Sequence, residues 1–406
     1  MSVTGIICEY NPFHEGHKYH IQKARERTGA SAVVVVMNGD FVQRGAPAII
    51  DKYTRARMAL SEGADLVFGL PVRYGLSSAE DFAYGGILAL ESLGFVDSYC
   101  FGCESGDVEA LGCAAGVLAE ESDVFRRSLS AALQSGKSYP AAREQALREQ
   151  MESEGTWDRM PDLTAPNNIL GLEYIRAAIG LHSSMVPVAV KRQGMGYHER
   201  EDAEGSGFLS ATAVRERIRK GNFDGIPEKA ERILRQADIY LGAEDFWMAC
   251  SYAIRSRWEN LEDIKDISAE LAARFRKCWY EAVSFDDFVN RCKTKNITMS
   301  RIRRCVFQTL VGIEKFKKRE KVLPYIRLLG MRQGAAKHLK LPGDTVVVGR
   351  LAKDKKKLGR DAREKLEQDI LASDLYRNAY MSRGGQVMPE EYRHSVMIVD
   401  DGDEPI

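Results

Sequence analysis

The stretch Ile6-Ile7-Cys8-Glu9-Tyr10-Asn11-Pro12-Phe13-His14-Glu15-Gly16-His17 decides the fold of this chain. It starts apolar and β-branched, which predicts a buried strand, and Asn11-Pro12 predicts the end of that strand. The polar residues 18–27 follow with helical spacing, so we expect a helix that begins at His17. The first turn of a helix has free N–H groups and a partial positive charge, and it therefore attracts phosphate.

The turn between this strand and this helix has the composition of a phosphate site. Gly16 lacks a Cβ where a ligand would come close, and the imidazoles of His14 and His17 can donate hydrogen bonds to phosphate oxygens as negative charge builds up. The pattern therefore indicates an ATP site that stabilises the displacement of pyrophosphate. Two alternatives stay open: the His-x-x-His spacing could hold a metal ion, or both histidines could be structural. His20 is expected to be a partly exposed helix residue.

The composition is that of a globular protein without a membrane span. Of 406 residues, 44% are hydrophobic and 29% are charged, which are ordinary values, and the length allows two or three domains. No apolar run approaches about 20 residues and no signal-peptide pattern is present, so we expect a cytoplasmic protein with no membrane partner. The eight cysteines are expected to be reduced core thiols, and Cys100-x-x-Cys103 to pack rather than bind a metal.

Strand and helix patterns alternate through the first half of the chain. After the first strand, apolar segments predict strands at 32–37, 65–70, 98–101 and 185–190. Helical patterns lie between them at 18–28, 51–62, 79–93 and 169–179. This alternation predicts an α/β fold with a Rossmann-like, parallel, five-stranded sheet and helices on both of its faces.

Polar residues collect where these strands end. Ligands of such sheets bind beyond the carboxyl ends of the strands, and His14, His17, Asp40, Arg44 and Gly102 all fall there. We therefore expect them to converge on one crevice. Taken singly, the last three have simpler explanations, as a turn former, a solvated charge and a strand-end glycine.

Two more segments add candidate ligands at the same edge. Asn167 and Asn168 precede a predicted helix; capping explains one asparagine and leaves the other free to contact a ligand. Lys191 and Arg192 end the fifth strand and suit a nucleotide phosphate or ribose, unless they are only a solvated strand end.

A second phosphate cradle is predicted at residues 205–215, Gly-Ser-Gly-Phe-Leu-Ser-Ala-Thr-Ala-Val-Arg. Ser210 and Thr212 are expected to cap a helix that continues to residue 220. Arg215 lies near the positive end of that helix, where a bound anion would offset its charge. No Walker loop, GxGxxG, GxSxG or HExxH pattern occurs.

Charge is unevenly distributed although Lys plus Arg and Asp plus Glu both total 58. Residues 300–366 carry 20 basic and 6 acidic side chains, a local net charge of +14. Such an excess favours a bound polyanion such as RNA, although basic clusters on helices are often only solvated faces. We expect three regions: 1–230, which binds ATP; 231–398, mainly helical and basic, with possible short strands at 325–328 and 345–348; and 399–406, an acidic and disordered tail.

The two phosphate motifs together resemble those of the HxGH nucleotidyltransferase superfamily. His14-x-Gly16-His17 matches its first motif and Ser210-x-Thr212-x-x-Arg215 matches its second, SxTxxR. The resemblance implies attack on the α-phosphate of ATP without a covalent enzyme intermediate, with the second motif on the β- and γ-phosphates.

Five segments narrow the resemblance to the bacterial tRNA(Met) cytidine acetate ligase family. They are GIICEYNPFHEGHKYHI, MNGDFVQRG, DKYTRARMAL, ADLVFGLP and NNILGLEYI. The resemblance implies that acetate attacks ATP to give acetyl-adenylate and pyrophosphate, and that the wobble cytidine of elongator tRNA(Met) then takes the acetyl group as N4-acetylcytidine. Acetate is already a nucleophile at neutral pH, so the protein must only neutralise and align the phosphates, with Mg²⁺ as an expected helper.

The resemblance also implies site residues. Isolated ATP contacts map onto Gly102, Arg192 and one of Asn167 and Asn168, with Asn168 favoured. The catalytic set is His14, His17 and Arg215, and Asp40 is a hypothesis for positioning the acceptor or the incoming amine. The main ATP segment comprises Ile7, Cys8, Glu9, Tyr10, Asn11, Pro12, Phe13, His14, Glu15, Gly16, His17, Lys18, Tyr19 and His20.

Two rival functions fit parts of the sequence. A small-molecule adenylyltransferase, acting on a nucleotide or a phosphopantetheine-like acceptor, would need only the first region, so the basic extension argues against it. A non-catalytic RNA-binding protein would not need two intact phosphate motifs.

Overall fold

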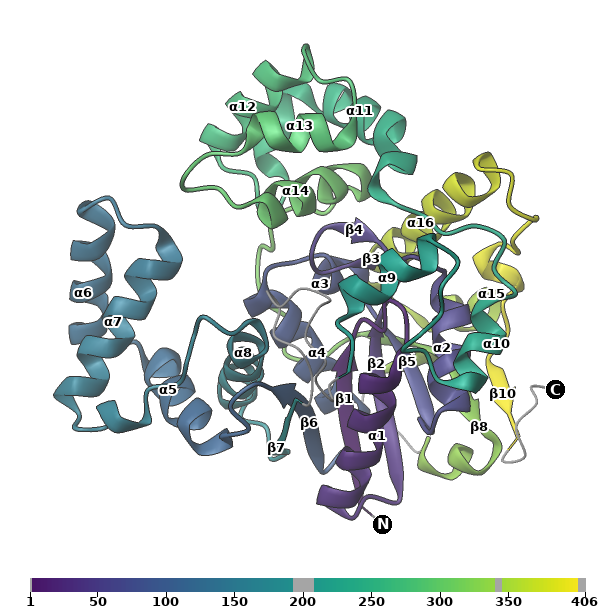
Figure 1. The fold of residues 1–406 in the computed structure, drawn as a ribbon, viewed down its shortest axis with the longest axis horizontal. Helices are drawn as coiled ribbons and strands as arrows, with labels where there is room; N and C mark the ends of the chain where they lie inside the picture. The colour runs from purple at the N-terminus through teal and green to yellow at the C-terminus, as the bar shows by residue number, and fades with distance from the viewer. Residues whose placement is uncertain (1, 193–207, 340–344, 401–406) are drawn as a thin grey trace.

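A computed structural model describes residues 2–192, 208–339 and 345–400 (Figure 1). Residues 205–207 of the second predicted phosphate cradle and residues 401–406 of the acidic tail lie outside these ranges. The five predicted strands form and pair in parallel in the order β5-β2-β1-β6-β7. Their bounds are β1 Val3–Cys8, β2 Ala32–Asn38, β5 Leu66–Leu70, β6 Ser98–Cys103 and β7 Val186–Lys191.

The sheet extends beyond these five strands. β8 (Tyr325–Arg332) pairs antiparallel with β5, and β9 (Val346–Val348) and β10 (Met397–Val399) pair parallel with β8. The short strands predicted near 325 and 345 therefore exist, and they complete a mainly parallel sheet of eight strands within the described residues. The α/β fold class is confirmed, and the sheet takes strands from both sides of residue 230.

Alternating side chains give the sheet two apolar faces. Val33, Val35 and Met37 of β2 point to one face, and Val34 and Val36 point to the other, as the pleat of a strand requires. Helices cover both faces (Figure 1). On the first face lie α1 Glu15–Thr28, α2 Lys52–Ser61, α9 Ala211–Arg219 and α10 Glu228–Leu234; on the second lie α4 Ala79–Leu93, α5 Val108–Glu120 and α8 Pro166–Gly180.

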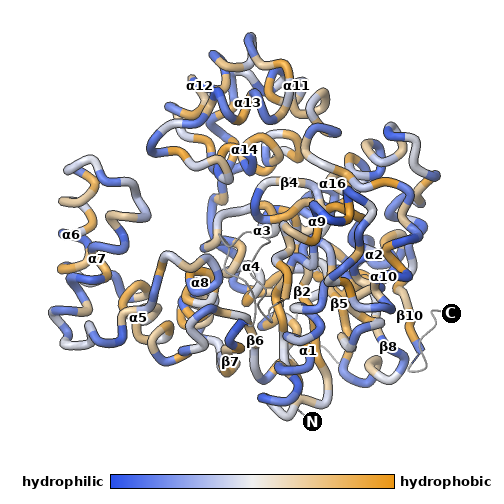
Figure 2. Tube along the Cα trace, in the orientation of Figure 1, coloured by the Kyte–Doolittle hydropathy of each residue, from blue (hydrophilic) through white to orange (hydrophobic). Residues whose placement is uncertain are grey.

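Two helical parts stand away from the sheet. α6 (Asp123–Gln134) and α7 (Tyr139–Ser153) pack against each other beyond α5, on the left of Figure 1. At the top lies a helical bundle of α11 Trp247–Ser256, α12 Ala269–Trp279, α13 Phe285–Cys292 and α14 Met299–Val311. Phe246, Phe275, Phe288 and Phe307 fill its core, and apolar and polar stretches alternate along its helices in Figure 2.

The C-terminal helix α16 (Arg360–Ser382) begins after Gly359, and its Tyr376 and Ala379 join the core of the bundle. The remaining short elements are α3 Val72–Gly75, α15 Leu351–Asp354, β3 Phe41–Val42, β4 Ala46–Pro47 and the 3-10 turns Trp157–Arg159, Ala243–Phe246, Trp258–Asp263, Gln333–His338, Lys355–Lys357 and Glu391–Arg393. No helix in the described ranges is both long and apolar enough to cross a membrane.

Candidate active site

The turn after β1 carries both histidines at the start of α1. The helix begins at Glu15 with His14 as its N-cap, so the predicted start at His17 was two residues late. The side chain of His14 caps the first turn, and the polar pattern of residues 18–27, from which the start was predicted, does not include that turn. Tyr10 adopts a positive φ of 45° as the chain leaves the strand, and Tyr10 and Phe13 are buried beneath the turn.

Each imidazole uses one nitrogen to hold the turn. Nδ1 of His14 accepts the N–H of Gly16 at 3.1 Å, and Nδ1 of His17 accepts the N–H of His14 at 3.2 Å. A neutral imidazole whose Nδ1 accepts a hydrogen bond carries its proton on Nε2; this tautomer is assigned from the hydrogen bonds. Each Nε2 is therefore an N–H donor. Capping and phosphate binding are not alternatives here, because each ring can do both.

The two rings lie together and are held on one side by aromatic groups. Their centroids are 3.6 Å apart with 27° between the planes. The ring of Tyr10 lies 4.7 Å and that of Phe13 5.6 Å from the ring of His17. Because the rings are stacked, the two Nε2–H donors belong to one small patch at the helix N-terminus.

Burial and neighbouring cations keep both imidazoles neutral. Burial, reinforced by Arg192 and Arg215, lowers the pKa of His14 to about 3. Burial, then the charges of His14 and Arg192, also lowers the pKa of His17 well below its usual value. At neutral pH both rings are consequently uncharged, and each presents an N–H group. His20 is partly exposed as predicted; its Nε2 lies 3.5 Å from Sγ of Cys100.

The second predicted motif meets the first. Arg215 on α9 donates from Nη1 to the carbonyl of Asn11 at 2.7 Å and from Nη2 to Oγ1 of Thr212 at 3.0 Å. Ser210 caps α9 by accepting the N–H of Ala213. The capping role predicted for Thr212 is wrong, because its hydroxyl holds the guanidinium of Arg215 instead.

Gly102 and Arg192 lie side by side at the ends of β6 and β7. A Cβ on Gly102 would come within 3.4 Å of Cγ of Arg192, and the N–H of Arg192 donates to the carbonyl of Cys103 at 3.0 Å. The charge of Arg192 acts on His14, His17 and His20. The structure therefore brings this predicted cation to the histidines.

The asparagine pair does not cap α8. The helix starts at Pro166, a residue suited to the first helical position, so both asparagines fall inside the first turn. Oδ1 of Asn168 accepts the N–H groups of Glu104 and Ser105 at 3.0 and 3.2 Å. Nδ2 of Asn167 donates to Oε1 of Glu104 at 2.6 Å. Both fix the turn that follows Gly102, and contact of either with ATP stays a prediction.

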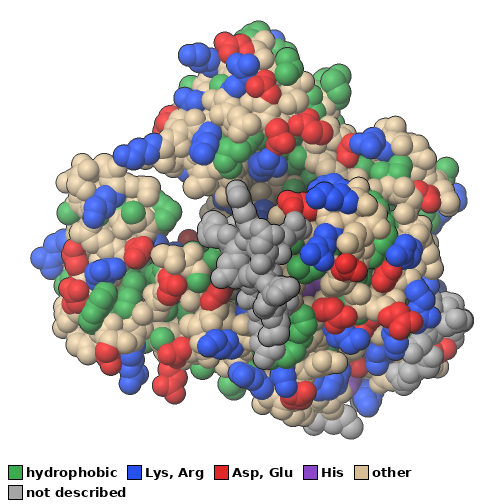
Figure 3. All heavy atoms as spheres, viewed as in Figure 1, with side chains coloured by type: hydrophobic (Ala, Val, Ile, Leu, Met, Phe, Trp, Pro, Cys, Tyr) green, Lys and Arg blue, Asp and Glu red, His purple; other side chains and the backbone are tan. Residues whose placement is uncertain are grey.

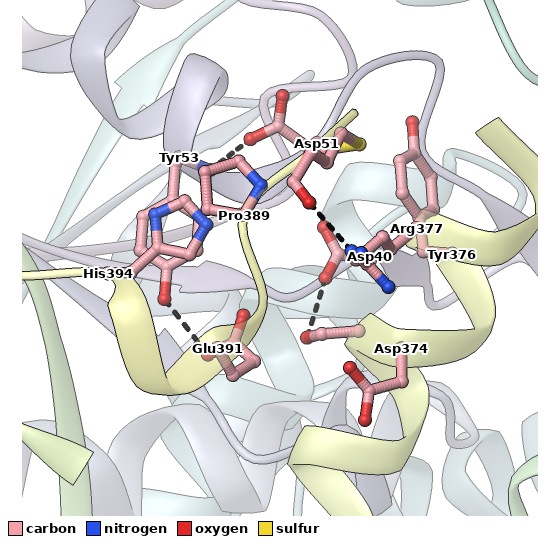
Figure 4. Close-up of a pocket in the computed structure, with 11 residues that line it drawn as sticks. Asp40, Asp51, Tyr53, Asp374, Tyr376, Arg377, Pro389, Glu391 and His394 are labelled. Carbon is pink, nitrogen blue, oxygen red and sulfur yellow. Dashed lines mark hydrogen bonds between the residues drawn. The ribbon is translucent and has the colours of Figure 1, made fainter. Parts of the chain in front are cut away.

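Asp40 belongs to a different environment, a buried ionic cluster of Asp40, Lys52, Ser373 and Glu391. Its Oδ1 accepts the N–H of Lys52 at 2.8 Å and its Oδ2 accepts the hydroxyl of Ser373 at 2.9 Å. Figure 4 shows Asp40 facing α16 and Glu391 facing Tyr53. The pocket in that view is lined by Asp40 but by neither active-site histidine. A role of Asp40 in acetyl transfer stays a prediction.

Lys52 neutralises the acids of this cluster. Its Nζ lies 2.6 Å from Oε1 of Glu391 and 3.5 Å from Oδ2 of Asp40. Burial opposes its charge, but the two carboxylates outweigh burial and raise the pKa of Lys52 above its ordinary value. No local sequence pattern indicates this pairing, because Glu391 lies in a short C-terminal turn far along the chain.

Much of the basic surplus of residues 300–366 is neutralised within the fold. Arg319 pairs with Glu80 and Asp81, and Arg303 pairs with Asp286. On the face drawn in Figure 3, blue and red side chains are interspersed. Lys317 and Lys318 are exposed and form no ion pair in the described ranges. In the same ranges, no three His, Cys, Asp or Glu side chains come together as a metal site.

The sequence of this chain matches the model of a known protein family. The model of the HIGH Nucleotidyl Transferase family matches residues 1–388. Together with the parallel sheet and the paired histidines at the first helix, this match shows that the chain belongs to the HIGH Nucleotidyl Transferase family.

Relatives define the family more narrowly. The tRNA(Met) cytidine acetate ligase of Clostridium novyi is 38% identical over 84% of this chain and 87% of its own length. That of Caldanaerobacter subterraneus is 37% identical over 94% of this chain and 96% of its own. The crystal structure of Thermotoga maritima TmcAL bound with alpha-thio ATP superposes with a TM-score of 0.89 and 30% identity, over 98% of this chain and 100% of that one. The chain belongs to the tRNA(Met) cytidine acetate ligase family and is a ligase, which confirms the resemblance.

Proposed function

We propose that this ligase uses ATP and acetate to form N4-acetylcytidine at the wobble position of elongator tRNA(Met). In the first step an acetate oxygen attacks the α-phosphorus of ATP, the bond to the β-phosphate oxygen breaks, and acetyl-adenylate and pyrophosphate form. In the second step the cytidine N4 attacks the acetyl carbonyl, AMP leaves, and the amine loses a proton. Each step exchanges one bond for another and needs no redox partner.

The observation that carries the proposal is that the two nitrogens of each imidazole have different roles. Both Nδ1 atoms accept backbone N–H groups, which leaves two adjacent Nε2–H donors. Donors fixed before the reaction stabilise developing negative charge without reorganisation. Because acetate is ionised at neutral pH, no general base is needed in the first step, and neutral histidines suit the task.

The other site residues are assigned around this pair. We propose that residues 7–20, Gly102, Arg192 and Asn168 contact ATP, and that Ser210, Thr212 and Arg215 hold its β- and γ-phosphates. Support comes from the hydrogen bond of Arg215 to Asn11. The Thermotoga maritima relative, which binds alpha-thio ATP, also supports a nucleotide site.

Mg²⁺ fits this site only as a companion of the substrate. The carboxylate of Glu9, which follows β1, accepts the N–H of Gln43 at 2.8 Å, and the described residues contain no acidic cluster for a metal. Mg²⁺ prefers phosphate oxygens and water with few protein ligands. When bound it would neutralise part of the triphosphate charge.

For the tRNA, we propose contacts in the region 231–398, which carries the helical bundle, α16 and the exposed Lys317 and Lys318. Phosphate-backbone binding needs cations that are not already neutralised, and these two lysines meet that condition within the described residues. A tRNA substrate would place the enzyme in the cytoplasm.

The direct test is nucleoside mass spectrometry of elongator tRNA(Met) after incubation with ATP and [¹³C₂]acetate. The expected result is ¹³C-labelled N4-acetylcytidine that depends on both substrates, with acetate-dependent ATP–pyrophosphate exchange in the absence of tRNA. Initiator tRNA(Met) is the matched control for tRNA choice. Adenylylation of a nucleotide or phosphopantetheine-like acceptor, with no acetylated cytidine, would instead support the small-molecule adenylyltransferase and overturn the proposal.

A further inference from the structure

Arg55 on α2 is fully buried, with no exposed surface, and within the described residues its guanidinium donates hydrogen bonds to main-chain carbonyls alone. Nε donates to Ile50 at 3.1 Å, and Nη1 donates to Glu9 at 2.7 Å and to Asn38 at 3.1 Å. Nη2 donates to Gly39. One side chain thus ties together the ends of β1 and β2 and the segment that precedes α2.

This cation has no carboxylate partner among the described residues. The nearby acids are engaged elsewhere: Glu9 accepts from Gln43, Asp40 from Lys52 and Ser373, and Asp51 from Tyr53 and Thr54. Burying a charge without an opposite charge is costly. An apolar residue of similar size would avoid that cost but would leave four main-chain carbonyls without this donor. The arginine therefore both satisfies these carbonyls and fixes the three segments that carry them.

The carbonyl of Glu9 lies at the base of the histidine turn, and a second guanidinium also holds this turn. Arg215 donates to the carbonyl of Asn11, whose Oδ1 accepts the N–H of Ile49 at 2.8 Å. Ile50, the next residue, accepts from Arg55. The segment Glu9–Asn11 is therefore fixed between two arginines shortly before the chain reaches His14.

We propose that Arg55 is a positioning residue of the adenylylation step, which holds the segment Glu9–Asn11 so that the Nε2–H groups of His14 and His17 meet the phosphates. This inference rests on the proposed function. Arg55 acts through the main chain and touches no reacting atom. A displacement of about 1 Å at reacting groups can cost about a hundredfold in rate, so loss of the four contacts is expected to lower kcat.

The test compares Arg55→Lys with wild type in acetate-dependent ATP–pyrophosphate exchange. Lysine keeps the charge but cannot reach three segments at once with a planar fork. We expect kcat to fall by about 10- to 100-fold while KM for ATP changes by less than about threefold, as for lost alignment rather than lost binding. The imidazole NMR signals of His14 and His17 should move in the variant without ATP present.

Arg274→Lys is the matched control. Arg274 also donates only to carbonyls, those of Cys292, Arg291 and Lys293, but in the helical bundle. It should leave kcat and both imidazole signals unchanged even if the melting temperature falls. Arg55→Gln, which keeps part of the hydrogen bonding without the charge, is the second variant.

The outcomes separate the inference from the proposed function. If wild type exchanges pyrophosphate with acetate and folded Arg55→Lys matches its kcat within twofold, the inference alone is wrong. If wild type shows no acetate-dependent exchange, the proposed function fails and the inference falls with it. If neither Arg55 variant folds, Arg55 is a folding residue and the inference is rejected.

Discussion

Polar side chains gather at the ends of two adjacent strands, β1 and β2, and the two groups differ in what they leave unused. After β1, His14 and His17 satisfy the backbone with Nδ1 and keep an Nε2–H donor each. After β2, the ionic cluster of Asp40, Lys52, Ser373 and Glu391 satisfies its donors and acceptors among its own members and with the neighbouring Tyr53. We infer that a polar residue at a strand end is a candidate for chemistry only when at least one of its hydrogen-bond donors or acceptors has no partner within the fold.

Lys52→Met should have the largest effect. It would leave the buried carboxylate of Asp40 without this cation and that of Glu391 with the more distant Arg327, at 3.8 Å. Breaking a buried pair typically costs about 3–5 kcal/mol of folding free energy. Urea unfolding measures this loss. Arg303→Met breaks the more exposed pair with Asp286 and should cost less than about 1 kcal/mol. Equal losses of folding free energy in the two variants would contradict the interpretation that the cluster is buried and fully paired.

His17→Asn should have the largest effect on catalysis. The Oδ1 of asparagine can replace Nδ1 as the acceptor for His14, but the Nε2–H donor is lost. Removal of one such donor typically lowers kcat by about 10²–10³-fold, which pyrophosphate exchange would measure. His17→Gln, which offers an N–H near the position of Nε2 but loses the cap, should keep more activity and less stability, and the reverse order would count against the assignment.

Asp40→Asn should act mainly on stability. The amide cannot accept at both ends as the carboxylate does, so we expect a loss of about 1–3 kcal/mol in unfolding free energy. In folded protein, acetyl transfer to tRNA should change by less than threefold. A selective loss of acetyl transfer with normal pyrophosphate exchange would instead support the positioning role that the sequence suggested for Asp40.

The double variant Lys317→Ala/Lys318→Ala should have a small effect, and this effect should be confined to RNA binding. Each lost phosphate contact should reduce the slope of log Kobs against log salt by about 0.7–0.9. Filter binding of tRNA at several salt concentrations measures this slope. Arg319→Ala, whose guanidinium already pairs with Glu80 and Asp81, is the paired control and should leave the slope unchanged.

The smallest expected effect is that of pH on catalysis. Because the pKa of His14 is lowered to about 3, its ring stays neutral from pH 6 to 9, and kcat/KM for exchange should show no histidine limb in that range. Stability should behave differently: the unfolded ring takes up a proton below about pH 6.5 and the folded ring does not, so the free energy of unfolding falls as pH drops from 6.5 toward 3. A catalytic limb near pH 6.5 that His14→Asn removes would contradict this.

Local patterns in the sequence predicted the main sheet. The run Val33–Val36 identified a buried strand, and Ser210 was recognised as a helix cap. The meeting of Arg215 with the histidine turn followed from the motifs rather than from local pattern. What the sequence did not reveal depends on contacts between distant residues: Glu391 reaching Lys52, β8 extending the edge at β5, and Arg55 collecting four carbonyls. None of these leaves a periodicity in the chain.

We expect the imidazoles of His14 and His17 to be neutral, with the proton on Nε2 and that proton directed to phosphate. Nitrogen-15 NMR of the histidine rings, with and without a non-hydrolysable ATP analogue, tests it most directly. The expected result is an unprotonated Nδ1 in both rings at pH 7 and a shift of the Nε2 signals, larger than that of the Nδ1 signals, when the analogue binds. Imidazolium rings, protons on Nδ1, or Nε2 signals that the analogue leaves unchanged would contradict it.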